Sequence, residues 1–493
     1  MTDKPRLARQ MGLLGLIATG VCSMMGVGIY VIPIMIQRNV PGIGSHVLLA
    51  YAFAVVPALL AALAYAILAS AMPRAGGSYI YVSRGLNPFL GFVASFSQWF
   101  GLSIAIGVVS YVLIPFLRDI AATLELTRWA EALESGPVRV GLALVFLWCF
   151  TLVNVFGVKV YERALVPLMF LMLIGGLVVI PAGYTFDQLD FVQAVAERDG
   201  LSLTLPPATP FEWRTVLAAA VILFSTFIGF DSIAQAGGEA KNPNRALPLA
   251  IGISIFSVGA YYIVFTAAMY HVVPWNYIAS QAASTDLTAP GLLGYLLEPG
   301  WTVLIIAGAA IALINDLPAM ILAVSRLMFA WAEDGIFPRG VARVNPKWRT
   351  PHIAIVLSSA MATVGILGSH LAGDFFLGVD ILVTAMLVNF FLTCLAVLVL
   401  PHRSPALADE IRFVRSRPLQ WVIGGGGAVL LGALLVIQIF KDLRAPATAW
   451  YFHSTPVYLA VMAIAAAVFL SEWKKLKKTG ADLSRAFKEL PPE

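Results

Sequence analysis

The sequence predicts an all-α integral membrane protein with about twelve transmembrane helices. Three observations support this fold class. Of the 493 residues, 59% are hydrophobic and only 12% are charged, which lies well outside the composition of ordinary soluble domains. Long apolar runs recur along the whole chain, without the period-2 alternation of barrel strands. The basic residues concentrate in alternate connections between these runs.

The apolar runs define the predicted helices. Each contains about the 20 residues that cross a hydrocarbon core of roughly 30 Å as a helix. They cover residues 11–37, 44–72, 88–117, 138–157, 164–183, 213–238, 248–273, 301–332, 352–371, 374–400, 419–440 and 453–472. The first run is too long for a secretory signal and lacks a small-x-small cleavage site, so a retained helix is predicted. The longest polar connection contains "LTLPPATP" and predicts an outer loop rather than a separate domain.

The positions of the basic residues predict the topology. With a cytoplasmic N-terminus, most of the 32 Lys and Arg residues fall in cytoplasmic connections, as the positive-inside rule requires. We therefore expect a multi-pass protein of the plasma (inner) membrane with both termini in the cytoplasm. Basic residues spread along one membrane face give no support to a nucleic-acid partner, so the lipid bilayer is the expected surrounding.

The reactive side chains predict neither a disulfide, nor a metal centre, nor an enzyme. Cys22, Cys149 and Cys394 all fall inside apolar runs and are odd in number, which does not favour pairing. The six His residues are scattered, and Ser, His and Cys lack the mutual spacing of a nucleophile with its base. No cofactor is expected beyond a coupling proton or sodium ion.

Interrupted helices predict the internal organisation. Gly26 and Gly28 in "SMMGVGIYVIP" lie midway along the first predicted helix, and Gly229 in "FSTFIGFDS" lies at a similar depth in the sixth. Since five helices separate the two interruptions, the second half enters from the opposite side, as in inverted-repeat transporters. The predicted divisions are an N-terminal segment 1–10, a first repeat 11–183, the loop 184–212, a second repeat 213–400, two appended helices within 401–472 and a basic tail 473–493.

A broken helix would leave backbone groups available to a ligand. Lipid cannot satisfy unpaired N–H and C=O groups, but a polar ligand can. The amides of Val27 and Gly28 would open the second half-helix and suit a carboxylate. The carbonyls of Met24 and of Ser225 to Ile228 would suit an ammonium group, so together these groups fit the head of an amino acid. The alternative is that the glycines only allow close helix packing.

Four short motifs between residues 24 and 338 are informative as a set. They are "MMGVGIYVIP", "MPRAGGSYIYVSRGLNPFLG", "IGFDS" with the following "EAKNPNRALP", and "SRLMFAWAEDGIFP". In this order they resemble the amino acid–polyamine–organocation superfamily of permeases. The resemblance implies a five-plus-five inverted-repeat fold, alternating access around a midplane site, and secondary transport of an amino acid or a related amine.

The resemblance also implies a set of substrate-binding residues. On the two broken helices and the third predicted helix these are Met24, Gly26, Val27, Gly28, Ser225, Phe227, Ile228, Gly229, Gly101, Leu102 and Ile106. With Ala105, the face of the third helix is wholly apolar and offers a guanidinium no partner. A neutral or apolar amino acid, or a compact amine, is therefore favoured. Phe227, Phe230 and Met320 are candidate gates, and ordinary packing is the alternative for the two aromatic rings.

Three carboxylates at membrane depth are candidates for a functional role, because ionisable groups are expensive there. Asp231 follows the break in the sixth helix, and Asp316 lies beside Asn315 in the middle of the eighth. Each carboxylate could carry a proton or help to bind sodium. The alternatives are a hydrogen bond that holds the broken helix and compensation for the backbone bond that Pro318 removes. For Asp380 we expect a structural role.

The expected function is secondary active transport of an amino acid, coupled to a proton or to sodium. Met172 stands where some proton-coupled relatives carry a lysine, so coupling through that lysine is not expected. An exchanger and a non-transporting membrane subunit are the alternatives. Ion pairs could close the cytoplasmic face, with loop solubility as the alternative. Their candidates are Arg74, Arg84, Glu239, Lys241, Arg245, Arg326 and Asp334.

Overall fold

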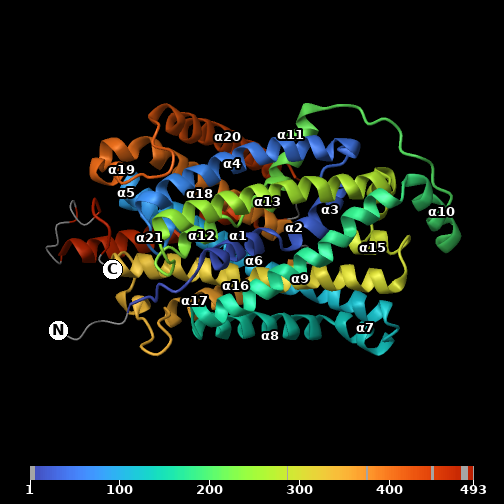
Figure 1. Cartoon of the computed structure of the whole chain (residues 1–493), viewed down its shortest axis with the longest axis horizontal. Helices are drawn as coiled ribbons and strands as arrows, with labels where there is room; N and C mark the ends of the chain where they lie inside the picture. Colours follow the sequence, from blue (N-terminus) through green and yellow to red (C-terminus); the bar gives the residue numbers. More distant parts are fainter. Residues whose placement is uncertain are drawn as a thin grey trace.

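The regular elements of the described part of the chain are helices. The computed structural model describes residues 6–285, 287–372, 376–445, 449–478, 483 and 487–491, and its long helices run side by side along the molecule (Figure 1). Within those ranges, extended pairing is limited to two isolated bridges, Met11 with Ala240 and Ala75 with Ala236. The prediction of an all-α fold is confirmed.

Eleven helices in the described residues are long and apolar enough to cross a membrane. They overlap eleven of the predicted runs, which confirms a multi-pass membrane protein. The five-plus-five inverted repeat stays a prediction. The eleven are α4 (Val47–Ala71), α6 (Pro88–Thr123), α8 (Gly136–Val155), α9 (Val158–Thr185), α11 continued by α12 (Trp213–Gln235), α13 (Pro243–Val272), α16 (Pro299–Glu333), α17 (His352–Ala372), α18 (Phe376–Arg403), α20 (Arg417–Arg444) and α21 (Ser454–Lys478).

The first predicted span is divided into three helices that are each too short to cross a membrane alone. These are α1 (Leu13–Met24), α2 (Val27–Tyr30) and α3 (Ile32–Asn39). Gly26 lies in the gap between α1 and α2. Pro33 lies in the first turn of α3, where its missing N–H removes no helical hydrogen bond.

The sixth predicted helix is also interrupted. α11 (Trp213–Phe224) passes into the 3-10 turn η2 (Ser225–Phe227), and α12 (Asp231–Gln235) resumes after a gap. Gly229 lies in this gap with a φ of +141°, which glycine adopts freely and other residues rarely adopt. Both interruptions expected from the glycine pattern are therefore present in the structure.

Short helices occupy the connections. The segment predicted as a loop over 184–212 contains α10 (Gln188–Asp199), at the end of the molecule opposite the chain termini (Figure 1). The Asp187 side chain accepts from the amides of Leu189 and Asp190, and the Asp190 carboxylate accepts from the Asp187 amide. This capping box stabilises the helix start. The others are α5 (Gly77–Gly85), α7 (Thr127–Glu134), α14 (Trp275–Ala282), α15 (Ala289–Leu293), α19 (Pro405–Asp409), η1 (Gly44–His46), η3 (Arg339–Ala342) and η4 (Trp450–Phe452).

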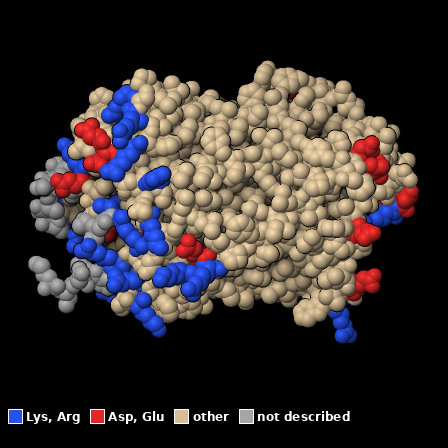
Figure 2. All heavy atoms as spheres, in the orientation of Figure 1, with Lys and Arg blue, Asp and Glu red and all other residues tan. Residues whose placement is uncertain are grey.

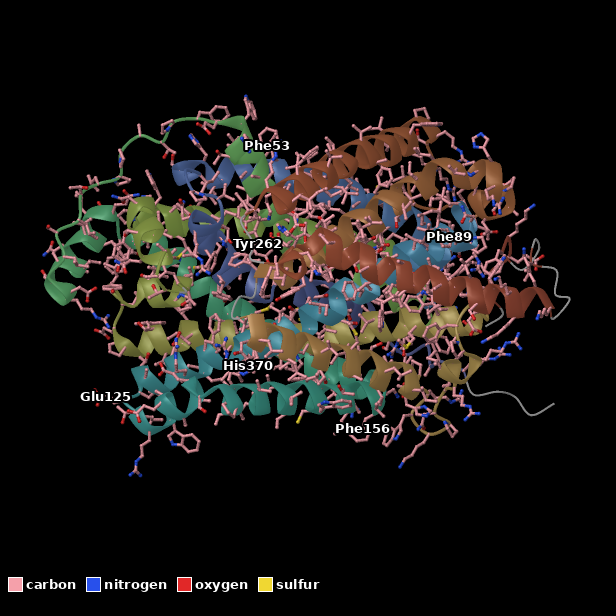
Figure 3. The ribbon with its side chains drawn as sticks, turned by 180° about the vertical axis from the view of Figure 1, so that it is seen from behind. Phe53, Phe89, Glu125, Phe156, Tyr262 and His370 are labelled. Carbon is pink, nitrogen blue, oxygen red and sulfur yellow. The ribbon has the colours of Figure 1, made fainter. Side chains whose placement is uncertain are left out.

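The charge distribution distinguishes the two ends of the molecule. In Figure 2, Lys and Arg gather at the end where the two termini lie in Figure 1, and most of the central surface shown is uncharged. Large apolar side chains such as Phe53, Phe89 and Phe156 are exposed along the bundle (Figure 3). An apolar belt between polar ends is the surface that a bilayer requires.

Both broken helices lie in the interior of the bundle. α1 packs against α13 and α16, and α12 packs against the same two helices. α6 packs against α16 and α18. The two interruptions, far apart in sequence, are thus brought together at the centre of the fold.

Candidate functional site

The two helix breaks touch each other. A Cβ on Gly229 would lie 2.7 Å from the Met24 amide nitrogen and would collide with the Ser23 backbone. The hydroxyls of Ser23 and Ser232 are hydrogen-bonded at 2.9 Å. The absence of a side chain at Gly229 is therefore needed for the crossing, which agrees with the alternative of close packing. A substrate-binding role for Gly229 stays a prediction.

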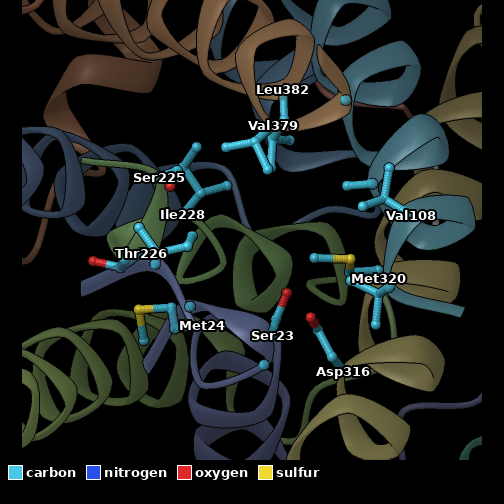
Figure 4. A pocket seen from close by; sticks show the side chains of 16 residues that line it. Ser23, Met24, Val108, Ser225, Thr226, Ile228, Asp316, Met320, Val379 and Leu382 are labelled. Atoms are coloured by element: carbon cyan, nitrogen blue, oxygen red, sulfur yellow. The ribbon is translucent and has the colours of Figure 1, made fainter. Parts of the chain in front are cut away.

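A cavity of about 60 Å³ opens beside this crossing. Figure 4 shows Asp316 and Ser23 on one side of it and Val379 and Leu382 on the other. Five segments of the chain form its wall. Among the described lining residues, one is charged. That lining consists of Ser23, Met24, Gly26, Gly28 and Ile32; Ala105, Val108 and Val109; Ser225, Thr226 and Ile228; Asp316 and Met320; and Gly378, Val379 and Leu382.

Asp316 is the unusual member of the lining. Its side chain projects from the middle of α16, and the residue is only 3% exposed. Oδ1 is buried and has no hydrogen-bond partner among the described residues. Oδ2 lies against Gly26, because a Cβ at that position would collide with it. A buried carboxylate without a partner is costly, so the cavity is suited to a positively charged occupant.

The carbonyl of Met24 already has a partner inside the protein. The Tyr262 hydroxyl, from α13, donates to it at 2.6 Å. Tyr262 is fully buried and stacks on Tyr51 with ring centroids 6.2 Å apart. Figure 3 shows it inside the bundle, away from both ends. Tyr262 could not be identified from the sequence, because it lies 238 positions from Met24 and belongs to none of the recognised motifs.

The hydroxyls near the second break bond to their own helix. Ser225 Oγ donates to the Ile222 carbonyl at 2.6 Å, and Thr226 Oγ1 donates to the Leu223 carbonyl at 2.7 Å. The Ile228 amide reaches the Ser225 carbonyl at 3.1 Å. Ser225, Thr226 and Ile228 therefore line the cavity mainly with apolar atoms and with hydroxyl oxygens that can still accept a hydrogen bond.

Asp231 lies outside the cavity lining and is fully buried. Its Oδ1 accepts from the Gly229 amide at 3.0 Å, and its Oδ2 accepts from the Gln98 side-chain amide. The Gln98 carbonyl oxygen in turn accepts from Gln235 at 3.2 Å and from Asn389 at 3.3 Å. These contacts agree with the alternative of a hydrogen bond that holds the broken helix to its neighbour. They leave a coupling role for Asp231 as a prediction.

The third predicted helix, observed as α6, presents only part of the predicted face to the cavity. Ala105 lines it together with Val108 and Val109, whereas Gly101 packs against α18, where a Cβ would lie 2.8 Å from Ala385. Leu102 and Ile106 are fully buried and lie outside the described lining. The apolar character expected for this wall is retained.

The candidate gates have different environments. Met320 lines the cavity. Phe227 packs edge-on against Tyr262 at 5.8 Å between ring centroids, and Phe230 stacks on Phe390 at 5.0 Å. Both phenylalanines are fully buried in aromatic clusters and are separate from the described lining.

The remaining polar candidates are partly paired. Asn315 donates to the Cys22 sulfur at 2.8 Å, and its carbonyl oxygen is buried without a partner among the described residues. Among the described residues, no group of three or more His, Cys, Asp or Glu is placed so that it could hold a metal ion. Asp380 accepts from Lys441 at 2.7 Å and from Gln438 at 3.1 Å, as expected for a structural role.

Two of the expected ion pairs form at the basic end. Arg326 pairs with Glu239 at 2.7 Å, and both side chains are almost completely buried. Arg84 pairs with Asp334. Burial would lower the pKa of Arg84, but the adjacent Asp334 carboxylate raises it above its ordinary value, so the Arg84 guanidinium stays charged at neutral pH. Lys241 and Arg245 are exposed.

Known proteins resemble this chain over most of its length. Residues 11–464 match the family of amino acid permeases. Cationic amino acid transporter 4 of Mus musculus is 29% identical over 427 residues, which cover 82% of this chain and 62% of the relative. The chain therefore spans less than two thirds of that relative's length.

Two bacterial relatives are of more similar length. The low-affinity putrescine importer of Escherichia coli strain K12 is 26% identical over 353 residues, or 70% of each protein. The branched-chain amino acid permease of Bacillus subtilis strain 168 is 25% identical over 415 residues, which cover 81% of this chain and 83% of the relative. The names of these relatives span cationic, amine and apolar substrates.

Proposed function

The chain belongs to the amino acid permease family, and we propose that it is a secondary active transporter for an amino acid or related amine with a compact apolar body. The observation that supports this proposal is the cavity at the crossing of the two broken helices. Its relatives are named as transporters and not as enzymes. A neutral or apolar amino acid, or a compact amine, fits the walls best.

The walls of the cavity favour a hydrocarbon body. Val108, Val379 and Leu382 would bury aliphatic atoms of a ligand, which contributes roughly 0.8 kcal/mol for each CH₂ group. The Asp316 carboxylate and the Ser23 hydroxyl lie on the opposite side (Figure 4), so the charged end of the cavity faces these apolar side chains. A ligand with one polar end and one apolar end would therefore bind in a single orientation.

A coupling cation can be accommodated at the same place. Asp316 is the carboxylate of the described lining, whereas Asp231 lies outside that lining and accepts a hydrogen bond on each oxygen. For a zwitterionic substrate, a proton or a sodium ion on Asp316 would compensate the buried charge, whereas an amine would bring that positive charge itself. Alternating access would then move both across the plasma membrane, with the basic end of Figure 2 in the cytoplasm.

The first experiment measures the thermal stability of the detergent-purified protein with a panel of amino acids and amines, with and without sodium and at two pH values. A ligand at about 100 times its Kd stabilises the folded state by about 2.7 kcal/mol. We expect a compact apolar member of the panel to stabilise the wild type. Uptake of that compound into proteoliposomes, with and without an ion gradient, then tests transport and coupling.

The matched variants are Gly28→Leu and Gly252→Leu. A Cβ on Gly28 would lie 2.9 Å from the Tyr262 hydroxyl, whereas one on Gly252 would meet open space. The stabilisation should be lost in Gly28→Leu and kept in Gly252→Leu. Uptake that requires a counter-solute and ignores ion gradients would indicate the exchanger. Absence of binding across the whole panel would contradict the proposal.

A further inference from the structure

We infer that the cavity selects a compact aliphatic amine that has no carboxylate group, and that Asp316 is the counter-ion of its ammonium group. This inference rests on the proposed function, because it concerns the substrate of the same cavity. It makes Asp316 the residue that determines specificity, rather than a site for a separate coupling ion. Four features of the structure support it.

The first feature is the charge of the cavity. Asp316 is the only charged side chain among the described lining residues, and its Oδ1 is buried without a partner there. A zwitterionic amino acid has no net charge, so it would leave this carboxylate uncompensated. A monoamine brings one positive charge, which matches one buried carboxylate.

The second feature is the position of the carboxylate. Oδ2 of Asp316 lies against Gly26, directly before the amides of Val27 and Gly28 that were expected to bind a substrate carboxylate. A second carboxylate at those amides would stand next to the first in a medium of low dielectric, where like charges repel strongly. Lys, Arg and His do not occur in the described lining, so a basic side chain to relieve the repulsion is missing there.

The third feature is the choice of acceptor for the ammonium group. The Met24 carbonyl, which was expected to accept from it, already accepts from Tyr262 at 2.6 Å. Asp316 is the only charged acceptor in the described lining, and the Ser23 hydroxyl lies on the same side of the cavity in Figure 4. An ammonium group on that side would gain an ion-paired hydrogen bond to Asp316 and could donate a second charge-assisted bond to a neutral oxygen.

The fourth feature is the opposite wall. Val379 and Leu382 of α18 face Asp316 across the pocket (Figure 4), and Val108 of α6 lies beside them. These side chains bury hydrocarbon, and the described lining holds no second carboxylate for another charge, only neutral hydroxyls such as those of Ser225 and Thr226. A neutral hydroxyl compensates the lost hydration of an ammonium group less well than a carboxylate does, so a monoamine is favoured over a diamine.

The test uses ligands with one carbon skeleton and different head groups. Isopentylamine carries only the ammonium group, leucine carries both charged groups, and isocaproate carries only the carboxylate. Binding to the full-length purified protein is measured by calorimetry and by thermal stability. We expect isopentylamine to bind most tightly, and butylamine to bind more tightly than the diamine putrescine.

Variants of Asp316 connect the preference to this residue. Asp316→Asn should weaken isopentylamine binding by about thirtyfold or more, and Asp380→Asn, a control at a partly exposed carboxylate outside the described lining, should leave it unchanged. Asp316→Glu retains the charge but reaches further into the cavity, so it should move the preference toward a shorter amine such as propylamine. That shift would not arise from a general loss of folding.

Two results would overturn the inference and are distinguishable. If leucine binds more tightly than isopentylamine, the substrate is a zwitterion and the inference is wrong, but the proposed function stands. If isopentylamine binds equally to wild type and to a folded Asp316→Asn variant, Asp316 is not the counter-ion. Failure of the proposed function itself would appear as no binding by any amine or amino acid of the panel.

Discussion

Asp231 and Asp316 are both buried carboxylates in the middle of the bundle, each close to a helix break, but their surroundings differ. Asp231 accepts hydrogen bonds on both oxygens, from Gly229 and from Gln98. Asp316 lines the cavity and has one oxygen without a partner among the described residues. The first carboxylate is hydrogen-bonded at the break between α11 and α12, and the second has an oxygen that could accept from a ligand. Burial of a charge in a membrane helix therefore does not by itself identify a binding residue.

The largest expected effect comes from removing the contact on which both breaks depend. Gly229→Ala would force alanine into a conformation that costs about 1–3 kcal/mol, and its Cβ would also collide with the backbone at Ser23. We expect a loss of stability above about 3 kcal/mol, with loss of ligand binding. Thermal unfolding in detergent measures this effect.

Gly252→Ala is the control for that change. Gly252 lies within α13, where a Cβ would meet open space, and alanine favours helix over glycine. Its thermal stability should equal or exceed that of the wild type. If Gly229→Ala were equally stable, the two breaks would not depend on their close contact.

The second effect tests the structural role of Asp231. In Asp231→Asn, one oxygen is replaced by a donor that faces Gln98, whose own oxygen is engaged by Gln235 and Asn389. We expect a loss of about 1–3 kcal/mol of stability with little change in ligand affinity. A variant that retains its stability but loses ion-coupled uptake would instead assign coupling to Asp231.

The third expected effect is a gain of stability rather than a loss. Asp316→Asn removes a buried charge that has an unpaired oxygen, so the ligand-free protein should be about 1 kcal/mol more stable than the wild type. Thermal unfolding without ligand measures this gain. A clear loss of stability in ligand-free Asp316→Asn would show that Asp316, like Asp231, holds the fold together, and the contrast between them would fail.

The smallest expected effect comes from the hydrogen bond between the Tyr262 hydroxyl and the Met24 carbonyl. Tyr262→Phe removes the hydrogen bond to Met24 and should cost about 1 kcal/mol. The neighbouring Tyr261 hydroxyl is buried without a partner among the described residues, so Tyr261→Phe should cost nothing. Equal stabilities for the two variants in thermal unfolding would indicate that the bond to Met24 is not important for the break.

Sequence analysis could locate the helix breaks, but it could not assign partners to the groups at them. Gly26 and Gly229 were identifiable because glycine in mid-helix stands out and because the surrounding motifs resemble a known family. The pairing of Met24 with Tyr262 depends on how α1 packs against α13, and no local pattern records that contact. The same holds for Val379 and Leu382, which reach the cavity because of the position of α18.

The sequence also could not predict which residues of α6 line the cavity. Residues at Ala105 and Val108 line the cavity, whereas Gly101 was expected to do so and packs against α18 instead. Every side chain on this part of α6 is apolar or small, so periodicity cannot indicate which face is turned inward. The chemical character of the wall was predictable, but its rotation was not.

The crossing of Ser23 and Gly229 also restricts how this cavity can evolve. Any side chain added at Gly229 would push the two backbones apart, so the polar end of the cavity cannot be enlarged one substitution at a time. The wall of Val108, Val379 and Leu382 belongs to intact helices and can exchange one apolar side chain for another. Selection for a larger or smaller solute could therefore act on that wall while the crossing stays unchanged.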